Sequence, residues 1–394
     1  MTSGPRVLGV LHLAELSGPA RSLRPWLERV ARNGRLQIAV PGDGAAARLY
    51  EPIAEVESAA YSALTLPRGP TGALRFAKEL HRQVVVFRVR IRACSPDLVV
   101  VATSTLPAAL IAARLEGAPA IVYVGEVIPT KPGLARAVGG RALAAATRAL
   151  AAAVVCCSDA AADAFGGSGP AVHVVRPGID STAPGDGAAF RRRHGLEDAD
   201  PCVVAVGNIS RRRGQDVLLH AVAQARAHLP QVGCAIVGAP HPRDEDLAFE
   251  QELHALAKRL GLEGSVSFAG FIEPIADAYA AADVVVNPIR TAEGLGRAGL
   301  EALAAGRPVI ASRVAGVSEA MRDGRDALLV TPGAADELAE ALARISGDDA
   351  LATRLVASGR EWVAATYSSE AGAERFAAIA DGVMERSSAP AVAE

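Results

Sequence analysis

The sequence predicts an α/β protein built from two doubly wound parallel-sheet domains, and three observations support this prediction. The chain has 394 residues, whereas a single hydrophobic core stops growing at roughly 250 to 300 residues. Half of the residues are apolar and 21% are charged, which is a globular composition. Short β-branched runs alternate with longer segments rich in Ala and Leu, as in repeated βαβ units.

The predicted strands fall into two series of six. We expect the first series at Val7–Leu11, Gln37–Val40, Leu98–Ala102, Ala120–Val124, Ala153–Cys157 and Val172–Val175. We expect the second at Cys202–Val206, Gly233–Val237, Val266–Ala269, Val284–Asn287, Val309–Ser312 and Ala327–Val330. Ligands of open parallel sheets bind beyond the carboxyl ends of the strands, so we expect the site in a cleft between two such sheets.

Turn-forming residues at 180–187 separate the two series and predict an interdomain linker. The expected domains are therefore residues 1–183 and 184–365. A helix over 366–385 should follow and pack back toward the first domain, and 386–394 should form a disordered tail.

Charge is distributed unevenly along the chain. Residues 1–183 carry 20 basic and 13 acidic side chains, a net charge of +7, which leaves −9 for the rest. This is either drift in an Arg-rich composition or a basic half that meets an anionic acceptor or membrane surface; a nucleic-acid partner is disfavoured.

The five cysteines form no CxxC pair, which disfavours a zinc site. Without a signal-peptide pattern we expect a cytoplasmic protein, at most peripheral at the inner membrane face.

The strongest local pattern is a Gly-rich turn between a strand and a helix that should begin near Leu295. Gly294 and Gly296 let the backbone approach a ligand closely. The free N–H groups at this helix start, up to Arg297, suit a pyrophosphate.

Two carboxylates flank this predicted anion site. Glu293 stands at its mouth, and Glu301 lies about 7 to 8 Å beyond Gly296 along the helix axis. One carboxylate can accept hydrogen bonds from sugar hydroxyls and the other from a ribose. The alternative is one Glu placed to suit the helix dipole and one that is merely solvated.

These residues resemble the signature of retaining family 4 glycosyltransferases, two glutamates separated by seven residues. Further segments resemble landmarks of that family over nearly the whole chain: 95–101, 154–159, 174–180, 207–214, 266–271, 283–288, 315–319 and 323–330. The resemblance implies the GT-B fold, in which two Rossmann-like domains face each other across a cleft. The N-terminal domain would bind the acceptor and the C-terminal domain the nucleotide-sugar donor.

The resemblance also implies roles for individual residues. Glu293 would hold hydroxyls of the donor sugar, and Glu301 would hold the ribose. Arg213 would bind the donor phosphates where the family usually has Lys, a change that the bidentate, permanently charged guanidinium tolerates.

This chain departs from the family at two loops. Asn208 occupies the place of the usual Arg, so Arg211 or Arg212 would have to reach the phosphates instead. Reinstating the family residue, Asn208→Arg, should then leave activity unchanged or raise it. In the first domain Gly18 precedes Pro19 in a loop that resembles the family's Gly-Gly loop and should contribute to donor binding.

A third departure follows the predicted strand that ends at Val124. The family presents a His there, whereas this chain has Gly125 and Glu126. We expect Glu126 to act as an acid or hydrogen-bond acceptor near the acceptor hydroxyl; a solvated Glu in a plain turn is the alternative. His12, after the first strand, fits a buried structural role.

Four arginines share one predicted helix: Arg82, Arg88, Arg90 and Arg92. They are either solvated surface residues or a contact for an anionic lipid or phosphorylated acceptor.

The implied reaction moves a hexosyl group from a nucleoside diphosphate sugar to a hydroxyl of a small molecule, glycan or glycolipid, with retention. Glu293, Arg213 and Glu126 would carry it by a front-face displacement. No acidic DxD pair stands where a metal would be needed, so we expect no metal and no cofactor. A non-catalytic nucleotide-sugar-binding protein and a nucleotide-sugar epimerase remain as alternatives.

Overall fold

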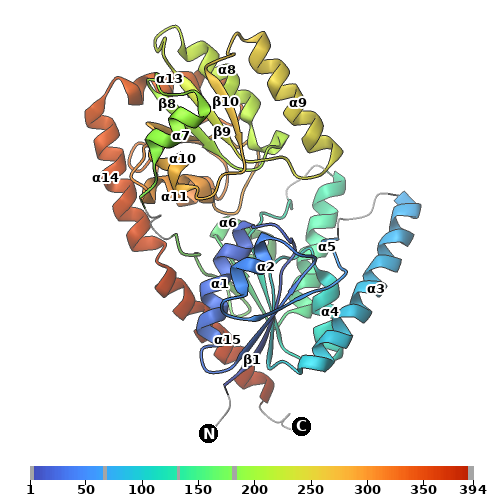
Figure 1. Ribbon diagram of the computed structural model, residues 1–394. Helices are drawn as coiled ribbons and strands as arrows, with labels where there is room; N and C mark the ends of the chain where they lie inside the picture. The colour runs from blue at the N-terminus through green and yellow to red at the C-terminus, as the bar shows by residue number, and fades with distance from the viewer. Residues whose placement is uncertain (1–3, 65–68, 131–133, 180–183, 389–394) are drawn as a thin grey trace. The chain divides into compact units, whose positions relative to one another are not determined.

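The computed structural model describes residues 4–64, 69–130, 134–179 and 184–388. The chain divides into two compact units (Figure 1). Unit 1 comprises residues 1–178 and 369–394, and unit 2 comprises 179–368. The boundary after residue 178 falls five residues before the domain boundary after residue 183 that the sequence predicted. Part of the expected linker, 180–183, and most of the expected tail, 389–394, lie outside the described residues.

Unit 1 contains one parallel sheet of seven strands in the order β3-β2-β1-β4-β5-β6-β7. Its strands are β1 (Arg6–Val10), β2 (Arg35–Val40), β3 (Glu55–Ser58), β4 (Leu98–Val101), β5 (Ala120–Val124), β6 (Ala153–Cys156) and β7 (Val172–Val174). The strand order reverses between β1 and β4, which pair with each other. The central strands are buried on both faces, which explains their continuous apolar runs.

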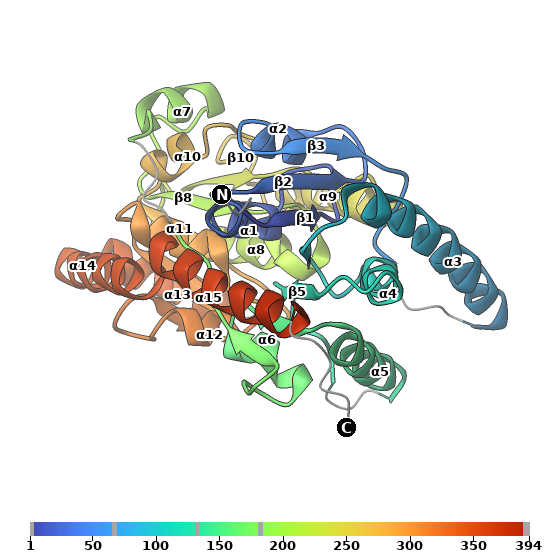
Figure 2. The ribbon, with the colours of Figure 1, turned by 90° about the horizontal axis from the view of Figure 1, so that it is seen from below.

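Helices cover both faces of this sheet: α1 packs on α15, and α3 packs on α4 (Figures 1 and 2). They are α1 (Gly18–Val30), α2 (Ala45–Tyr50), α3 (Gly69–Cys94), α4 (Pro107–Leu115), α5 (Leu134–Leu150), α6 (Asp159–Ala162), the 3₁₀ turn η1 (Asp163–Phe165) and α15 (Ser369–Ser388). None of the described helices is both long and apolar enough to span a membrane.

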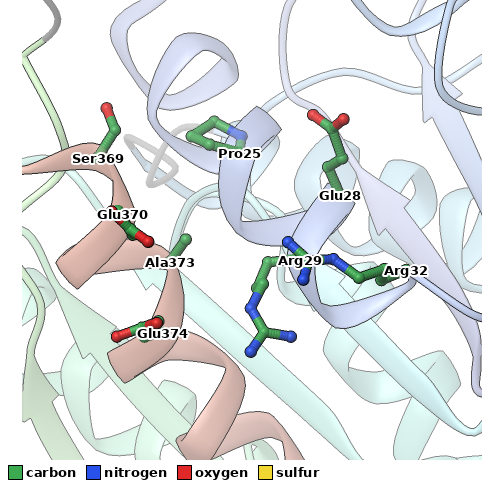
Figure 3. Close-up of a pocket in the computed structure, with 8 residues that line it drawn as sticks. All are labelled: Pro25, Glu28, Arg29, Arg32, Ser369, Glu370, Ala373 and Glu374. Atoms are coloured by element: carbon green, nitrogen blue, oxygen red, sulfur yellow. The ribbon is translucent and has the colours of Figure 1, made fainter.

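The last helix, α15, belongs to unit 1 although it follows unit 2 in sequence. Its Phe376 stacks on Trp26 of α1 with ring centroids 5.0 Å apart, and both rings are fully buried. A surface pocket between the two helices carries charges of both signs from Arg29, Glu370 and Glu374 (Figure 3). None of the predicted site residues lines this pocket.

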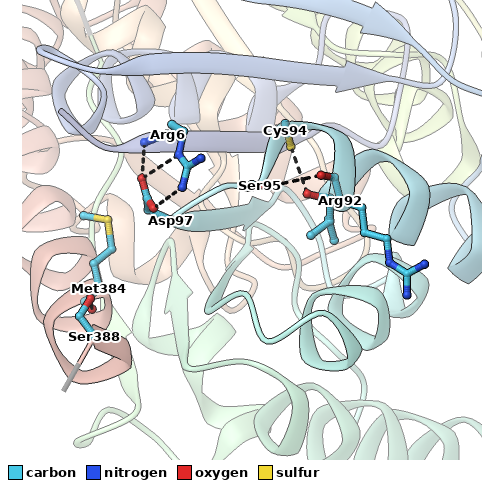
Figure 4. Close-up of polar contacts among 8 residues, drawn as sticks. Arg6, Arg92, Cys94, Ser95, Asp97, Met384 and Ser388 are labelled. Carbon is cyan, nitrogen blue, oxygen red and sulfur yellow. Dashed lines mark hydrogen bonds and ion pairs between the residues drawn. The ribbon is translucent and has the colours of Figure 1, made fainter. Parts of the chain in front are cut away.

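The amino ends of β1 and β4 are held by a charged clamp. Both carboxylate oxygens of Asp97 accept from Arg6: its backbone N at 2.8 Å and its Nη2 at 3.0 Å (Figure 4). The clamp lies at the opposite edge from the carboxyl ends of the strands, so it serves strand register.

Unit 2 contains a second parallel sheet, of six strands in the order β10-β9-β8-β11-β12-β13. Its strands are β8 (Cys202–Val206), β9 (Gly233–Val237), β10 (Val266–Gly270), β11 (Val284–Asn287), β12 (Val309–Ser312) and β13 (Leu328–Val330). Its helices are α7 (Gly187–His194), the 3₁₀ turn η2 (Arg211–Arg213), α8 (Gln215–Ala225), α9 (Asp244–Arg259), α10 (Ala276–Ala281), α11 (Arg297–Ala304), α12 (Val317–Ala320), α13 (Ala335–Ser346) and α14 (Asp349–Thr366). The order again reverses where β8 pairs with β11.

All twelve predicted strands are present, and the structure adds β3. This edge strand, Glu55–Ser58, is mostly exposed and has Val56 as its one apolar residue, so it lacks the hydrophobic signal of a buried strand. It is held by Arg35 of β2, whose Nη2 lies 2.8 Å from both carboxylate oxygens of Glu55. Edge strands carry such charges commonly.

Asp326 has the most buried carboxylate among the described residues of unit 2, and we expect it to control stability at acid pH. Burial opposes its ionisation, but hydrogen bonds from Arg322 and Ser358 outweigh burial and lower its pKa. A lowered folded-state pKa stabilises the protein above the unfolded value of about 4, and this stabilisation is lost as the pH falls through the folded pKa. Asp326→Asn should cost about 3 kcal/mol at pH 7.

Thermal and urea unfolding between pH 7 and pH 2 measures this effect. The gap between wild type and Asp326→Asn should narrow as the pH falls below about 4. The exposed Asp198→Asn is the matched control and should leave the unfolding free energy unchanged. If the difference in unfolding free energy between wild type and Asp326→Asn stayed the same at low pH, the ion pair between Asp326 and Arg322 would not be its source.

Candidate functional site

The candidate site of unit 2 lies at the carboxyl ends of β8 and β11, where the strand order reverses. The loop after β8 carries Asn208 and leads through η2 to α8, and the turn after β11 carries Glu293 and leads to α11. Because parallel strands end at the same edge of a sheet, residues about 80 positions apart come together there.

The chain path of both loops depends on glycines in left-handed conformation. Gly214 has φ +69°, and a Cβ there would lie 2.0 Å from the carbonyl oxygen of Pro288 in the turn after β11. Gly296 has φ +72° and directly precedes α11, which begins at Arg297 rather than near Leu295. Gly294 and Leu295 are buried in the turn before it. Only glycine allows this approach without strain.

Glu293 and two arginines form the charged centre of this edge. Its Oε1 lies 2.8 Å from Nη1 of Arg213 and 3.7 Å from Nη1 of Arg212. Burial and the neighbouring Arg213 lower the pKa of Arg212, although a guanidinium stays charged in proteins. The side chains of Arg213 and Glu293 are 19% and 16% exposed, so their attraction is only partly screened.

The second oxygen of Glu293, Oε2, is buried and has no hydrogen-bond partner among the described residues. A buried carboxylate oxygen without a donor is costly, so it marks a place where a further donor group fits.

Arg211 takes no part in this centre. Its guanidinium pairs with Glu252 of α9 and lies 5.0 Å from the ring centroid of Phe249. Of the two arginines considered as substitutes for the missing family Arg, only Arg212 approaches Glu293.

Glu301 is buried on α11 and engages Tyr279 and Arg297. Its Oε2 accepts from the Tyr279 hydroxyl at 3.0 Å, and its Oε1 lies 2.9 Å from Nε of Arg297. A solvated glutamate is thus excluded at this position. A carboxylate offers about four acceptor positions, so both oxygens can still accept ligand hydroxyls.

Glu126 lies at the carboxyl edge of unit 1, in the loop after β5. Its Oε1 accepts from Oγ1 of Thr103 at 2.8 Å and from Oγ and N of Ser104 at 2.6 and 3.1 Å. Its Oε2 accepts from N of Gly125 at 3.1 Å. The interpretation of Glu126 as a solvated turn residue is therefore wrong, because the loop after β4 supplies it with donors.

His12 and Gly18 occupy the same edge of unit 1. Burial lowers the pKa of His12, and the Glu126 carboxylate partly offsets this, which favours the neutral imidazole at pH 7. Gly18 begins α1 directly after the cap residue Ser17, whose hydroxyl accepts from N of Ala20 at 3.3 Å. A Cβ on Gly125 would lie 3.4 Å from Pro19, so the two loops approach each other closely.

Residues 200–348 match the family described as Glycosyl transferases group 1. The chain is 32% identical over 236 residues to the GDP-mannose-dependent alpha-(1-6)-phosphatidylinositol monomannoside mannosyltransferase of Mycolicibacterium smegmatis. The aligned segment covers 57% of this chain and 59% of that protein. It is 36% identical over 196 residues to the D-inositol 3-phosphate glycosyltransferase of Kribbella flavida, with coverage of 47% and 45%. The chain spans about half the length of these curated relatives.

Among solved structures, Anabaena Alr3699/HepE in complex with UDP and glucose matches with a TM-score of 0.80 and 23% identity. The match covers 96% of this chain and 99% of that one. The fold is GT-B. In this GT-B chain, unit 2 contains the matched family segment together with Asn208, Arg212, Arg213, Glu293 and Glu301.

Each of the four arginines that share helix α3 forms an ion pair with a carboxylate. Arg88 and Arg92 both pair with Glu116 of the α4 end, Arg82 pairs with Glu79, and Arg90 with Glu57. All four arginines are paired within unit 1, and the side chains of Arg82 and Arg92 remain 48% and 62% exposed, so these two are solvated surface residues.

The sequence did not reveal the side chains that hold the two other acids, Tyr279 for Glu301, and Thr103 and Ser104 for Glu126. Tyr279 lies 22 residues before its partner and Ser104 lies 22 residues before Glu126. The only signal in the sequence was position: Thr103 and Ser104 follow a strand, and Tyr279 lies on a short helix.

Proposed function

We propose that this GT-B chain is a retaining glycosyltransferase that moves a hexosyl group from a nucleoside diphosphate sugar to an acceptor hydroxyl. The observation that carries the proposal is Glu293, whose Oε1 is held by Arg213 while its buried Oε2 receives no hydrogen bond from any described residue. A hydroxyl of a donor sugar supplies the missing hydrogen bond, and the adjacent guanidinium supplies the charge that a diphosphate needs.

The remaining donor contacts follow from the same edge of unit 2. Arg213 and Arg212 would bind the phosphates, and the backbone amides of 294–297 at the start of α11 would add neutral donors. Glu301, steadied by Tyr279, would accept from the ribose. As the donor bond breaks, charge develops on the leaving diphosphate, and these preorganised groups stabilise it.

Retention is proposed to arise from a front-face displacement in which the acceptor oxygen attacks on the side of the leaving phosphate. The residues of unit 2 then serve to position the donor and neutralise the leaving group. The two guanidiniums supply the positive charge, so we propose that the reaction needs no metal and no cofactor.

The names of the relatives guide the choice of substrates. They include a GDP-mannose-dependent mannosyltransferase and a D-inositol 3-phosphate glycosyltransferase, and the Anabaena protein was solved with UDP and glucose. Unit 1 carries 22 basic and 17 acidic side chains, a net charge of +5, which favours an anionic polyol or glycolipid acceptor.

A panel of UDP-, GDP-, ADP- and dTDP-linked hexoses tests the proposal on the purified full chain. A donor at 100 times its dissociation constant stabilises the fold by about 2.7 kcal/mol, which a thermal shift detects. Transfer or slow donor hydrolysis that persists in EDTA, with an unchanged anomeric configuration in the product NMR spectrum, supports it. Donor isomerisation indicates an epimerase, binding without turnover a binding module, and no binding refutes the proposal.

Glu126 tests the acceptor side separately. Glu126→Ala should lower transfer more than tenfold, about the effect of losing a positioned acid or base, because the acceptor hydroxyl loses its partner. Nucleoside diphosphate binding and acceptor-free donor hydrolysis should remain, since they depend on unit 2. The exposed Glu51→Ala is the control. Equal losses in transfer and hydrolysis would mean that Glu126 only holds the strand ends together.

A further inference from the structure

Asn208 contacts the arginine that the proposed function places at the donor phosphates. Its side-chain Oδ1 accepts from Nε of Arg213 at 3.3 Å. Its other side-chain atom, Nδ2, donates to Oγ of Ser210 at 3.4 Å, and its backbone oxygen accepts from Gln215 at 3.0 Å. Asn208 thus faces Arg213 with an acceptor, and Gln215 anchors its backbone.

The guanidinium of Arg213 is held at two points. Nε is engaged by Asn208, and Nη1 is engaged by Glu293 at 2.8 Å. The guanidinium also lies beside Gly207, where an added Cβ would be in ordinary van der Waals contact, 3.4 Å from Nε and 3.5 Å from Cζ.

These contacts fix the rotation of the guanidinium group. With Nε and Nη1 engaged, both hydrogens of Nη2 stay available, and none of the described residues accepts a hydrogen bond from it. A flexible Arg side chain would otherwise lose much rotamer freedom on binding a phosphate, which weakens the bound state.

We propose that Asn208 is a positioning residue that orients Arg213 through Nε and thereby directs Nη2 toward the donor diphosphate. The inference rests on the proposed function, because it assumes that Arg213 meets the phosphates. It also reverses the expectation for Asn208→Arg. A second cation in place of the acceptor would repel Arg213 and remove its anchor, so this change lowers activity.

A double-mutant cycle tests the pairing on the purified full chain. Asn208→Ala should lower kcat/KM for the donor about fivefold, the effect of one ordinary hydrogen bond, with most of the loss in kcat. Arg213→Lys keeps the charge but has no Nε donor, so Asn208→Ala added to it should change kcat/KM less than twofold, which is non-additivity. Titration of the wild type and the three variants with UDP and GDP gives a second readout. The effect of Asn208→Ala on nucleotide affinity should likewise be smaller when Arg213 is replaced by Lys.

Ser210→Ala is the matched control in the same loop. It removes the contact to Nδ2 and keeps Oδ1, so kcat/KM should stay within about twofold, the scatter expected of a change that spares the contact. Additive losses in the cycle, a Ser210→Ala loss equal to that of Asn208→Ala, or higher activity in Asn208→Arg would each overturn the inference. If the wild type neither binds nor turns over any donor, the proposed function fails instead.

Discussion

Arg213→Ala should reduce turnover at saturating donor by about 10² to 10³, or about 2.7 to 4 kcal/mol in transition-state stabilisation. Among the described residues Arg213 is the guanidinium nearest to Glu293, at 2.8 Å, and is mostly buried, so its charge would act at close range on the proposed leaving diphosphate. Steady-state kinetics with the best donor of the panel measures the loss.

Arg211→Ala is the matched control for this change. Arg211 lies two residues away in the same 3₁₀ turn, but its side chain pairs with Glu252 and stacks on Phe249 of α9. Its removal should leave turnover nearly unchanged. Arg212→Ala should cost well over tenfold if Arg212 replaces the missing family cation. Near-normal turnover in Arg213→Ala would mean that the phosphate site is misplaced.

Glu293→Ala should abolish transfer, with a loss of about 10² or more, while nucleoside diphosphate affinity stays within about threefold. The carboxylate is proposed to contact the sugar, and nucleoside diphosphate has none. Removing Glu293 also frees Arg213 from its ion pair, so the affinity for the diphosphate can rise but should not fall.

Glu301→Gln should show the opposite pattern, with nucleoside diphosphate affinity falling about tenfold because charged hydrogen bonds to the ribose weaken. Calorimetric titration of both variants separates the two roles. The exposed Glu340→Ala on α13 is the control in the same unit. Equal losses of nucleotide affinity in Glu293→Ala and Glu301→Gln would refute the separate roles.

Most of the fold could be predicted because buried parallel strands require continuous apolar runs, which are local in the sequence. β3 was not predicted, because an exposed edge strand needs no continuous apolar run. Its Glu55 is instead held by Arg35. The end of unit 1 was also placed too late, since turn formers mark a boundary only approximately.

In the candidate site, the sequence by itself determined which residues reach the strand ends. The spacing of Glu293 and Glu301 around a Gly-rich turn follows from local backbone geometry, since left-handed glycines and a helix start are encoded within a few residues. The residues after β8 reach the same edge because their strand is parallel to β11.

Only the tertiary structure decided which side chains meet. Among three consecutive arginines it directs Arg213 to Glu293 and Arg211 to α9, and it makes Asn208 a partner of Arg213 rather than a gap in the family pattern. It likewise gives Glu126 its donors from the loop after β4. Such pairs depend on strand order and on rotamers set by neighbouring elements, and residues far apart in the chain supply both.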